Sequence, residues 1–280
     1  LWAALRMSAG TLTFGGMTAF LQLVNKIQSP ARNLTKLAPA FVSVFTAAER
    51  LMELAAEPLE EQGEPITVGA PCGIRLENVT YKYEDGTKDV ISNLSFDFRP
   101  GSCTAILGET GAGKTTLVRM LLALMKPKEG RIVLYNDMEE HTLSPRMRCN
   151  FVYVPQGNTL MSGTIRENLR LGKPSATDEE MKEALLMSCA DFVFSLPDGL
   201  STKCGEQGGG LSEGQAQRIA IARALLRDKH IMVFDEATSA LDGDTECRLL
   251  GNILDNNSRT VIFITHRPAV LQYCNEQLHL

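Results

Sequence analysis

A glycine-rich segment near the middle of the chain places the strongest constraint on the fold. Residues 108–116 read Gly-Glu-Thr-Gly-Ala-Gly-Lys-Thr-Thr and fit the pattern G-x-x-x-x-G-K-[ST]. A short apolar run, residues 104–107, precedes the segment, and an apolar helical pattern, residues 115–125, follows it. In this order of strand, loop and helix, backbone N–H groups surround a phosphate and the helix aims its positive N-terminus at it. The segment is therefore predicted to bind nucleotide phosphates.

Within this loop, Lys114 is expected to place its charge on the phosphates, and the Thr115 hydroxyl is expected to ligate Mg²⁺. The residues expected to contact the nucleotide are Gly108, Glu109, Thr110, Gly111, Ala112, Gly113, Lys114, Thr115 and Thr116. By itself the loop predicts a P-loop nucleoside triphosphatase and does not select a branch of that class.

The order of short apolar runs predicts an α/β fold. Beyond residue 101 such runs alternate with helical patterns, which is typical of a mainly parallel sheet flanked by helices. The predicted strands of this part are residues 104–107, 151–154, 231–234 and 261–265, and an earlier pair is residues 74–83 and 90–98, separated by a turn at residues 84–86. A mostly helical insert is expected over residues 156–210. It contains a helix over residues 177–189 that begins with Thr177 and Glu180 in capping-box spacing.

The first 54 residues differ in composition from the rest of the chain. Residues 1–24 carry a single charge, at Arg6, and no acidic residue occurs before Glu49. A membrane-spanning helix needs about 20 mostly apolar residues, which this stretch provides, and the basic residues that follow have the bias of a cytosolic side. Taken alone, residues 1–54 fit a membrane helix and a buried helical hairpin of a soluble protein equally well.

Turn residues divide this N-terminal part. Gly10 and Thr11 predict that residues 1–8 end one helix, and that a second helix begins near Thr13 and continues through residues 38–54. Residues 57–64 are rich in proline and acidic side chains and are expected to form a solvated linker.

Two carboxylates follow the apolar run at residues 231–234. Asp235 is expected at the C-terminal mouth of the strand, where open α/β sheets bind ligands, and would hold Mg²⁺ directly or through water. Glu236 is placed to polarise the attacking water. A lone Asp-Glu pair often only begins a loop, but with a phosphate-binding loop upstream the pair predicts nucleotide hydrolysis.

Composition narrows the possible partners. The net charge is −5, and no stripe of Lys and Arg interleaved with aromatic residues occurs, so nucleic acid is not expected as a partner. Seven cysteines are scattered singly without C-x-x-C spacing, which favours reduced thiols in a cytosolic domain over a disulfide framework or a zinc site. The chain begins with Leu and has no leader with a cleavage site, so we expect a fragment of a longer protein.

Residues 211–218, Leu-Ser-Glu-Gly-Gln-Ala-Gln-Arg, open a helix that is expected to end near Leu226. They resemble the signature sequence of the ABC ATPases, whose usual form is LSGGQ. The resemblance implies that Ser212, Gly214 and Gln215 close over the γ-phosphate held by the P-loop of a second ATP-binding domain. A hydroxyl and a backbone N–H at a helix N-terminus are suited to hold an anion.

Glu213 departs from that signature, because the family usually has glycine there. A carboxylate beside a phosphate is electrostatically unfavourable unless its side chain points away and only the backbone meets the ligand. The effect of Glu213 on the rate of hydrolysis stays open.

Four further positions resemble landmarks of the same family. Gln156 resembles the Q-loop glutamine, which reaches the metal and the attacking water. Asp242 resembles the D-loop aspartate at the dimer interface, and His266 resembles the switch histidine that contacts the γ-phosphate. Tyr83 resembles the aromatic residue that stacks on adenine, although Tyr81 stays an alternative because residues two apart share a face of a strand.

The resemblance thus implies a set of roles. The expected catalytic residues are Lys114, Gln156, Glu236 and His266, and the expected metal ligands are Thr115, Gln156 and Asp235. The expected cofactors are ATP and Mg²⁺.

Other segments resemble the exporter branch of the ABC transporters, in which a membrane domain and an ATP-binding domain are fused. They are residues 205–208 before the signature, residues 163–169 after the Q-loop, and residues 14–20, 29–30 and 47–50 in the N-terminal part. The implied domains are 1–54, the end of a transmembrane domain with its last membrane helix; 55–72, a linker; and 73–280, an ABC ATP-binding domain with a helical subdomain at about 156–227.

The implied fold is an α/β P-loop NTPase of ABC type, with a mainly parallel sheet, an antiparallel β-subdomain and a helical subdomain, preceded by a transmembrane and cytosolic helix. The implied function is ATP hydrolysis coupled to export. The expected partners are a second ABC ATP-binding domain, the chain's own transmembrane domain and the membrane, and not nucleic acid. The expected location is the cell (inner) membrane, with the ATP-binding domain in the cytoplasm.

Alternatives remain. A soluble ABC ATPase acting on DNA or ribosomes would carry a coiled-coil insertion or paired ATPase domains, and an importer subunit would lack a fused membrane helix. The substrate, and the choice between a homodimer and a heterodimer, are not readable from the sequence.

Overall fold

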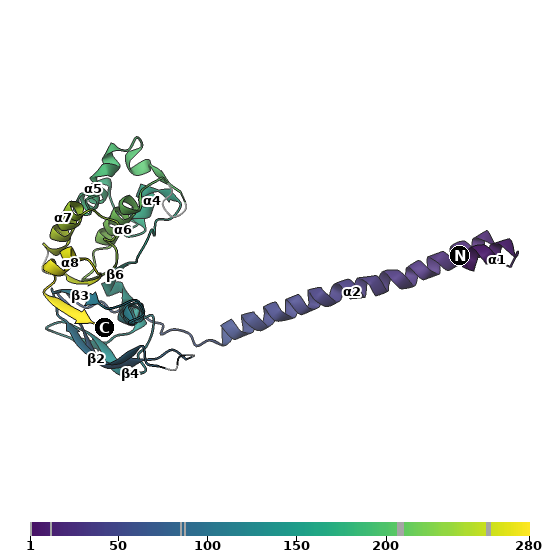
Figure 1. The fold of residues 1–280 in the computed structure, drawn as a ribbon, viewed down its shortest axis with the longest axis horizontal. Coiled ribbons are helices and arrows are strands. Elements are labelled where there is room, and N and C mark those ends of the chain that lie inside the picture. The colour runs from purple at the N-terminus through teal and green to yellow at the C-terminus, as the bar shows by residue number, and fades with distance from the viewer. Residues whose placement is uncertain (1, 12, 85, 87, 206–209, 256–258) are drawn as a thin grey trace. The chain divides into compact units, whose positions relative to one another are not determined.

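The computed structural model describes residues 2–11, 13–84, 86, 88–205, 210–255 and 259–280. Their contacts divide the chain into two units, Leu1–Glu60 and Glu61–Leu280, which are described separately below (Figure 1). The division falls within residues 55–72, where the sequence predicts a linker.

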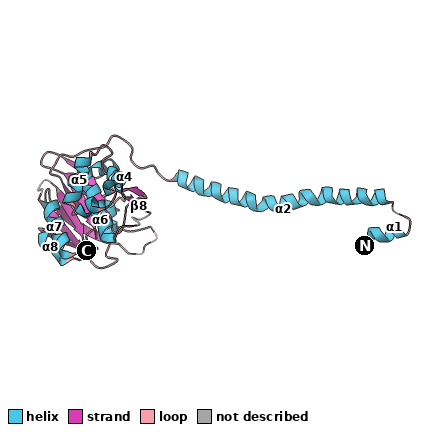
Figure 2. Cartoon of the chain, turned by 90° about the horizontal axis from the view of Figure 1, so that it is seen from above, coloured by secondary structure: helices cyan, strands magenta, loops and turns pink. Residues whose placement is uncertain are grey.

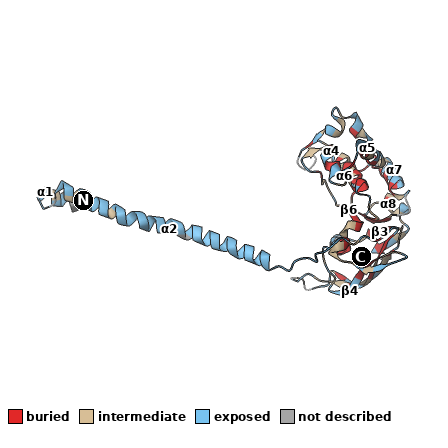
Figure 3. Cartoon of the chain, turned by 180° about the vertical axis from the view of Figure 1, so that it is seen from behind, coloured by how far each residue is buried: buried red, intermediate tan, exposed pale blue. Residues whose placement is uncertain are grey.

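The N-terminal unit consists of helix α1, Trp2–Ser8, and helix α2, Phe14–Ala56, which Figure 2 shows as separate helices. The Thr13 side chain accepts a hydrogen bond from the backbone N–H of Gly16, so α2 begins where the sequence predicts. Most side chains of α2 are exposed, including large apolar ones (Figure 3). Among the residues that the structure describes, no helix combines the length and the apolar character that crossing a membrane requires.

The second unit begins with a four-stranded antiparallel sheet of order β2-β1-β4-β5. Its strands are β1, Gly73–Tyr81; β2, Ile91–Phe98; β4, Glu129–Tyr135; and β5, Glu140–Thr142. Strand β1 ends two residues earlier than expected, because Val90 N–H bonds to the Tyr81 carbonyl and begins the return to β2. Residue 85, within the predicted turn, and residue 87, directly after it, lie outside the described residues.

A five-stranded sheet forms the centre of this unit, with order β11-β3-β10-β9-β6 and every neighbouring pair parallel. Its strands are β3, Cys103–Leu107; β6, Phe151–Val154; β9, Ile231–Asp235; β10, Thr260–Ile264; and β11, Glu276–His279. All residues of β10 are buried, as expected of a parallel strand covered on both faces. The carboxyl ends of parallel strands share one edge, so the loops after β3, β6, β9 and β10 meet there.

Helix α3, Lys114–Leu121, follows β3 and ends four residues before the predicted boundary. Ala123 adopts a left-handed conformation with φ of 53°, which a helix does not accommodate. The guanidinium of Arg148 donates to the carbonyls of Leu122 and Ala123 and so satisfies backbone groups that the helix end leaves free. Arg148 lies in the 3₁₀ helix η1, Pro145–Asn150.

The segment between β6 and β9 is mostly helical, as predicted. It contains β7, Gly163–Thr164; α4, Ile165–Arg170; α5, Asp178–Met187; η2, Asp191–Ser195; η3, Gly199–Ser201; β8, Lys203–Cys204; and α6, Glu213–Arg227. The predicted capping box of Thr177 and Glu180 starts α5. The left-handed backbone of Cys189, with φ of 56°, explains why α5 stops before residue 189.

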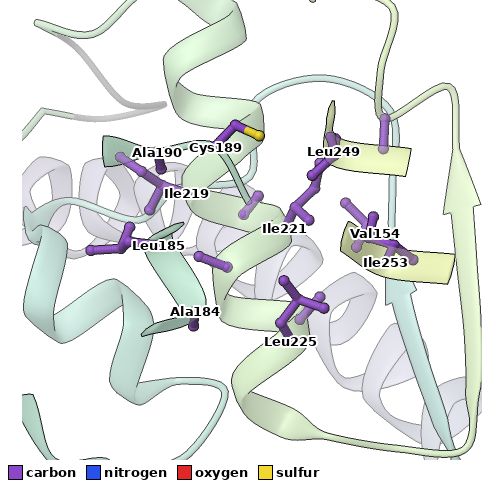
Figure 4. Close-up of a cluster of buried hydrophobic side chains, with 14 of the residues drawn as sticks. Val154, Ala184, Leu185, Cys189, Ala190, Ile219, Ile221, Leu225, Leu249 and Ile253 are labelled. Carbon is purple, nitrogen blue, oxygen red and sulfur yellow. The ribbon is translucent and has the colours of Figure 1, made fainter. Parts of the chain in front are cut away.

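One buried apolar cluster joins this helical segment to the rest of the unit. Leu185 of α5 and Ile219 of α6 pack beside Leu249 and Ile253 of α7, Gly243–Leu254, as Figure 4 shows. The cluster includes Val154 at the end of β6, so the helices are held against the edge of the parallel sheet where its loops meet. The short helix α8, Pro268–Tyr273, lies between β10 and β11 in the chain.

Candidate nucleotide-binding site

The loop between β3 and α3 has the backbone that a phosphate-binding loop needs. Gly111 and Gly113 have φ of 90° and 99°, values that other residues rarely adopt. At Gly113 a Cβ atom would also lie 3.0 Å from the carbonyl oxygen of Val90, so both backbone and space require glycine. Gly113 is the N-cap of α3, and the first backbone N–H groups of that helix therefore point into the loop.

Lys114 connects this loop to the end of β10. Its Nζ donates to the carbonyl oxygens of Gly108, at 2.5 Å, and Glu109, at 3.2 Å. The same Nζ lies 3.2 Å from Nε2 of His266, which follows β10. Two residues 152 positions apart, both predicted to contact nucleotide phosphates, are thereby brought together.

Strand β9 brings the two predicted acidic residues to the same edge of the sheet. Glu236 has a left-handed backbone with φ of 48°, and its N–H bonds to the carbonyl of Ile264 in β10. Its carboxylate accepts a hydrogen bond of 2.7 Å from Nε2 of Gln156, which follows β6. A strained backbone at a residue that other contacts fix in place is typical of functional sites.

Asp235 lies beside them in a partly buried position. Its Oδ2 accepts a hydrogen bond of 2.9 Å from the Tyr153 hydroxyl. Burial raises the pKa of the Asp235 carboxyl, and the neighbouring Glu236 raises it further, while the Tyr153 hydrogen bond and Lys114 oppose the shift. The sequence did not point to Tyr153, because an aromatic residue in an apolar strand carries no sign of a carboxylate partner.

Tyr83 and Tyr81 have different surroundings, which separates the two candidates for the adenine side. Tyr81 packs against the buried apolar cluster behind β1, whereas Tyr83 is 38% exposed. The Tyr83 hydroxyl lies 3.1 Å from the Thr116 hydroxyl in α3, beside the phosphate-binding loop. The geometry favours Tyr83.

The signature residues form the start of α6. Ser212 is the N-cap of that helix: its hydroxyl accepts from the N–H of Gln215, whose side chain accepts from the N–H of Ser212. A Cβ atom at Gly214 would lie 2.7 Å from the carbonyl oxygen of Ala240, so glycine permits close packing against that backbone. Glu213 is exposed.

The segment of residues 238–242, which includes Asp242, is called the D-loop segment below. The buried amide of Gln217 in α6 contacts it twice, at 3.4 Å to the Ser239 hydroxyl and 3.3 Å to the Ala240 N–H. Asp242 is exposed and is the N-cap of α7, and hydrogen bonds from Thr245 lower the pKa of its carboxyl. The signature and the D-loop segment thus form one connected surface.

Arg267 also holds the D-loop segment in place. One guanidinium nitrogen donates to the carbonyls of Thr238, Ser239 and Leu241, at 2.9 to 3.0 Å. Its Nε lies 3.1 Å from the carboxylate of Glu246, whose side chain is 1% exposed. Sequence analysis missed Arg267, Gln217 and Glu246, and the position of Arg267 directly after His266 was the one signal available.

The described residues contain no group of three or more His, Cys, Asp or Glu side chains that could together hold a metal ion. A site for Mg²⁺ does not require one, because this ion is usually bound by one or two carboxylates together with substrate phosphates and water. Residues 206–209, which include most of the predicted exporter loop at 205–208, lie outside the described residues.

Similarity to known proteins agrees with this geometry. A sequence profile of the family "ABC transporter" matches residues 91–239, from β2 through the signature to the D-loop segment. The fold and the site define an ATP-binding domain of the ABC class, and the chain belongs to the ABC transporter family.

Curated relatives of this chain include transporters and a flippase. The chain is 38% identical over 267 residues to the mitochondrial iron–sulfur clusters transporter ATM1 of Kluyveromyces lactis, covering 92% of this chain and 37% of that protein. It is 36% identical to the ATP-dependent lipid A-core flippase of Bordetella avium, with 95% and 46% covered. It is 35% identical to the fatty acid ABC transporter ATP-binding/permease protein of Mycobacterium bovis, with 96% and 43% covered. The chain therefore spans less than half the length of these relatives.

A solved structure of a bacterial Atm1-family ABC exporter with ATP bound aligns with 100% of this chain and 50% of its own, at a TM-score of 0.75 and 31% sequence identity. The chain is thus similar over its whole length, α2 included, to the ATP-binding region of an exporter and the helix before it.

Proposed function

We propose that this chain is the ATP-hydrolysing and energy-coupling part of an ABC exporter. The observation that carries the proposal is the position of four side chains, one from each of the segments after β3, β6, β9 and β10, which contact one another in two pairs at one edge of the parallel sheet. Lys114 contacts His266, and Gln156 contacts Glu236, so the residues suited to the γ-phosphate and to its attacking water lie at the same edge of the sheet.

In this proposal the phosphate-binding loop and Lys114 hold the β- and γ-phosphates, and Tyr83 stacks on adenine. Glu236 polarises a water molecule in line with the γ-phosphate, Gln156 positions that water, and His266 donates to the γ-phosphate. The products are ADP and phosphate.

Mg²⁺ fits the donors at this edge, because the Thr115 hydroxyl, the Asp235 carboxylate and the Gln156 amide present the hard oxygen atoms that it prefers. When bound, the ion neutralises phosphate charge. The Tyr153 hydroxyl holds one oxygen of Asp235 and leaves the other available.

The site is proposed to need two chains. Ser212, Gly214, Gln215 and Asp242 form a surface with the D-loop segment, and we assign them to the γ-phosphate held by a second ABC ATP-binding domain. The start of α6 supplies helix N-terminal N–H groups and a hydroxyl for that phosphate. Whether the second domain belongs to an identical chain is an outcome of the test below.

Helix α2 is proposed to come from the transmembrane domain, with residues 55–72 as linker and 73–280 as the ATP-binding domain. Apolar side chains such as Phe14, Ile27 and Phe41 are at least 65% exposed along it, and such surfaces are usually covered by another part of the protein. Its 43 residues correspond to about 65 Å. We place the protein in the cell (inner) membrane with the ATP-binding domain in the cytoplasm.

The names of the three relatives specify iron–sulfur clusters, lipid A-core and fatty acid, and so select no single cargo for this chain. Cargo is chosen by membrane helices, whereas the contacts described above concern the nucleotide. The proposal therefore stops at export driven by ATP hydrolysis.

The test uses Glu236→Gln in the whole chain. This variant should bind ATP yet lose hydrolysis by about 100-fold or more, because the water loses its base. In the presence of ATP the variant should then accumulate as a stable pair of chains. Size exclusion with light scattering measures the mass of that pair. Glu179→Gln, an exposed change on α5, is the matched control and should behave as the parent.

Three outcomes are informative. A Glu236→Gln chain that stays monomeric with ATP at high concentration would contradict the shared site. A chain that pairs only when mixed with a different ABC subunit would show a heterodimer. Undiminished ATP hydrolysis by Glu236→Gln would show that Glu236 does not polarise the attacking water.

A further inference from the structure

Two cysteines far apart in the sequence meet at the base of the parallel sheet. Sγ of Cys103, the first residue of β3, lies 3.1 Å from Sγ of Cys274, which follows α8. Both are free thiols; Cys103 is 5% exposed, and Cys274 is half-buried against the same apolar cluster. The pair lies at the opposite end of β3 from the phosphate-binding loop, so the nucleotide does not use it.

The backbone around the pair is held in place from both sides. The Cys103 N–H donates to the Asn275 side chain at 3.0 Å, and the Asn275 N–H donates to the Cys103 carbonyl at 2.9 Å. From there β11 runs parallel to β3, with Glu276 opposite Thr104. A bond would require the two sulfur atoms to approach by only about 1 Å.

The hydrogen bond between the two thiols shifts their pKa values in opposite directions. Their hydrogen bond, and then burial, raise the pKa of the Cys103 thiol. The same hydrogen bond lowers the pKa of the Cys274 thiol. The thiolate is the reactive form of a cysteine, so the lowered pKa favours Cys274 as the attacking sulfur.

A small cavity of about 160 Å³ lies beside Cys103. Cys103, Arg259, Tyr273 and Asn275 are among its lining residues. The guanidinium of Arg259 is paired with Asp228 through one nitrogen, at 2.6 Å, while its buried Nη1 has no hydrogen-bond partner among the described residues. A small polar oxidant that enters this cavity meets an unsatisfied donor and the Cys103 sulfur, which lies 3.1 Å from the Cys274 sulfur.

We propose that Cys103 and Cys274 are a redox modification site, at which peroxide forms a reversible disulfide. The Cys274 thiolate attacks one oxygen of hydrogen peroxide, the O–O bond breaks, and a sulfenic acid and, after protonation, one water are produced. The Cys103 sulfur then attacks the Cys274 sulfur, the S–O bond breaks, and the disulfide and a second water are produced. Two electrons pass from the two thiols to the peroxide, and a dithiol reductant reverses the change.

The bond would tie the C-terminal strand to the strand that carries the phosphate-binding loop. Helix α8 lies between His266 and Cys274 in the chain. The disulfide would therefore include the loop after β10 in the covalent ring formed by residues 103–274. Opening of β11 away from β3 should become rarer, because the two strands can no longer separate at that end. Formation of this disulfide does not depend on ATP hydrolysis.

The experiment treats the whole chain with hydrogen peroxide, alkylates the remaining thiols, and maps peptides under non-reducing conditions. We expect one cross-linked species, joining the peptides of Cys103 and Cys274, that dithiothreitol removes. Amide exchange of Glu276–His279 should slow by about tenfold or more in the oxidised chain. Both changes should be absent in Cys274→Ser.

Cys247→Ser is the matched control, because Cys247 is exposed and distant in the sequence from both members of the pair. This variant should still form the cross-link and the slower exchange. Cys103→Ser should instead leave a trappable sulfenic acid on Cys274. Oxidation confined to Cys247, no cross-link at peroxide concentrations that oxidise Cys247, or a cross-link with unchanged exchange of β11 would each overturn the proposal.

Discussion

The two sides of the proposed nucleotide site are built in different ways. On the phosphate-loop side, side chains from four segments contact one another in pairs, Lys114 with His266 and Gln156 with Glu236. On the signature side, Ser212 and Asp242 cap helices, and the contacts of Gln217 and Arg267 fix backbone. On the first side polar side chains contact one another, whereas on the second side such contacts are made to backbone groups. Substitutions should therefore lower ligand affinity on one side and stability on the other.

The largest effect is expected for Lys114→Ala. Removing a cation that donates to three acceptors should weaken ATP binding by about 100-fold, the equivalent of roughly 3 kcal/mol. Thermal unfolding without nucleotide should change little, since Lys114 is only partly buried. Equilibrium binding of a fluorescent ATP analogue measures the effect, with exposed Lys126→Ala as control. If Lys114→Ala and Lys126→Ala lost ATP affinity equally, a specific role of Lys114 in phosphate binding would be contradicted.

Arg267→Ala should act on the other side, by loosening the D-loop segment. Three carbonyls would lose their donor and the buried Glu246 carboxylate its cation, which should lower the free energy of unfolding by about 3 kcal/mol. Adding Glu246→Gln should restore part of this loss, because the unpaired charge is removed. Chemical denaturation of the single and double variants measures it, and strictly additive losses would contradict the coupling.

Gly214→Ala should show how closely α6 packs on the D-loop segment. The new Cβ would lie 2.7 Å from the Ala240 carbonyl oxygen, so the helix must shift, at about 2 kcal/mol of stability. Gly251→Ala in α7 is the matched control, since its Cβ meets nothing within 4 Å and alanine should stabilise that helix by about 0.5 to 1 kcal/mol. The two variants should move the unfolding temperature in opposite directions. ATP affinity of the single chain should stay the same in both.

The smallest effect is expected for Asp235→Asn in the nucleotide-free chain. The folded pKa of Asp235 is raised above its ordinary value of 3.8, mainly by burial, so the folded state binds this proton more tightly than the unfolded state. Its ionisation therefore opposes folding at neutral pH, and the penalty disappears as the pH falls towards 3.8. Asp235→Asn should raise the unfolding temperature at pH 7 to 8, with a difference that shrinks on acidification. A stability gain that grows on acidification would contradict the sign.

Much of the fold was predictable because its signals are local. The strand before the phosphate-binding loop, the helix after it and the capping box of Thr177 and Glu180 each depend on residues a few positions apart, and all are present. The errors fall at element ends. The helix after the loop stops at Leu121 and the strand before residue 83 stops at Tyr81, because a left-handed residue and a turn hydrogen bond intervene. The spacing of apolar residues predicts neither the left-handed residue nor the turn hydrogen bond.

The candidate site was predictable in a different sense. The spacing of the motifs and their resemblance to the ABC family gave the residues, and the structure brings Lys114, Gln156, Glu236 and His266 to one edge of the sheet. The roles of Ser212, Gly214, Gln215 and Asp242 towards a second domain stay predictions. The contacts of Tyr153, Gln217 and Arg267 were missed, since none belongs to a motif by its type alone.

By itself the sequence determined the class of protein: the glycines of the phosphate-binding loop, the acidic end of β9 and the signature each need particular residue types at fixed spacing, whatever surrounds them. Only the tertiary structure decided which distant side chains meet. The order β11-β3-β10-β9-β6 places β10 between β3 and β9, and so sets His266 beside Lys114. The same order sets Cys274 beside Cys103. Contacts of this kind depend on which strands become neighbours, and strand order is fixed by packing of the whole sheet rather than by any segment of it.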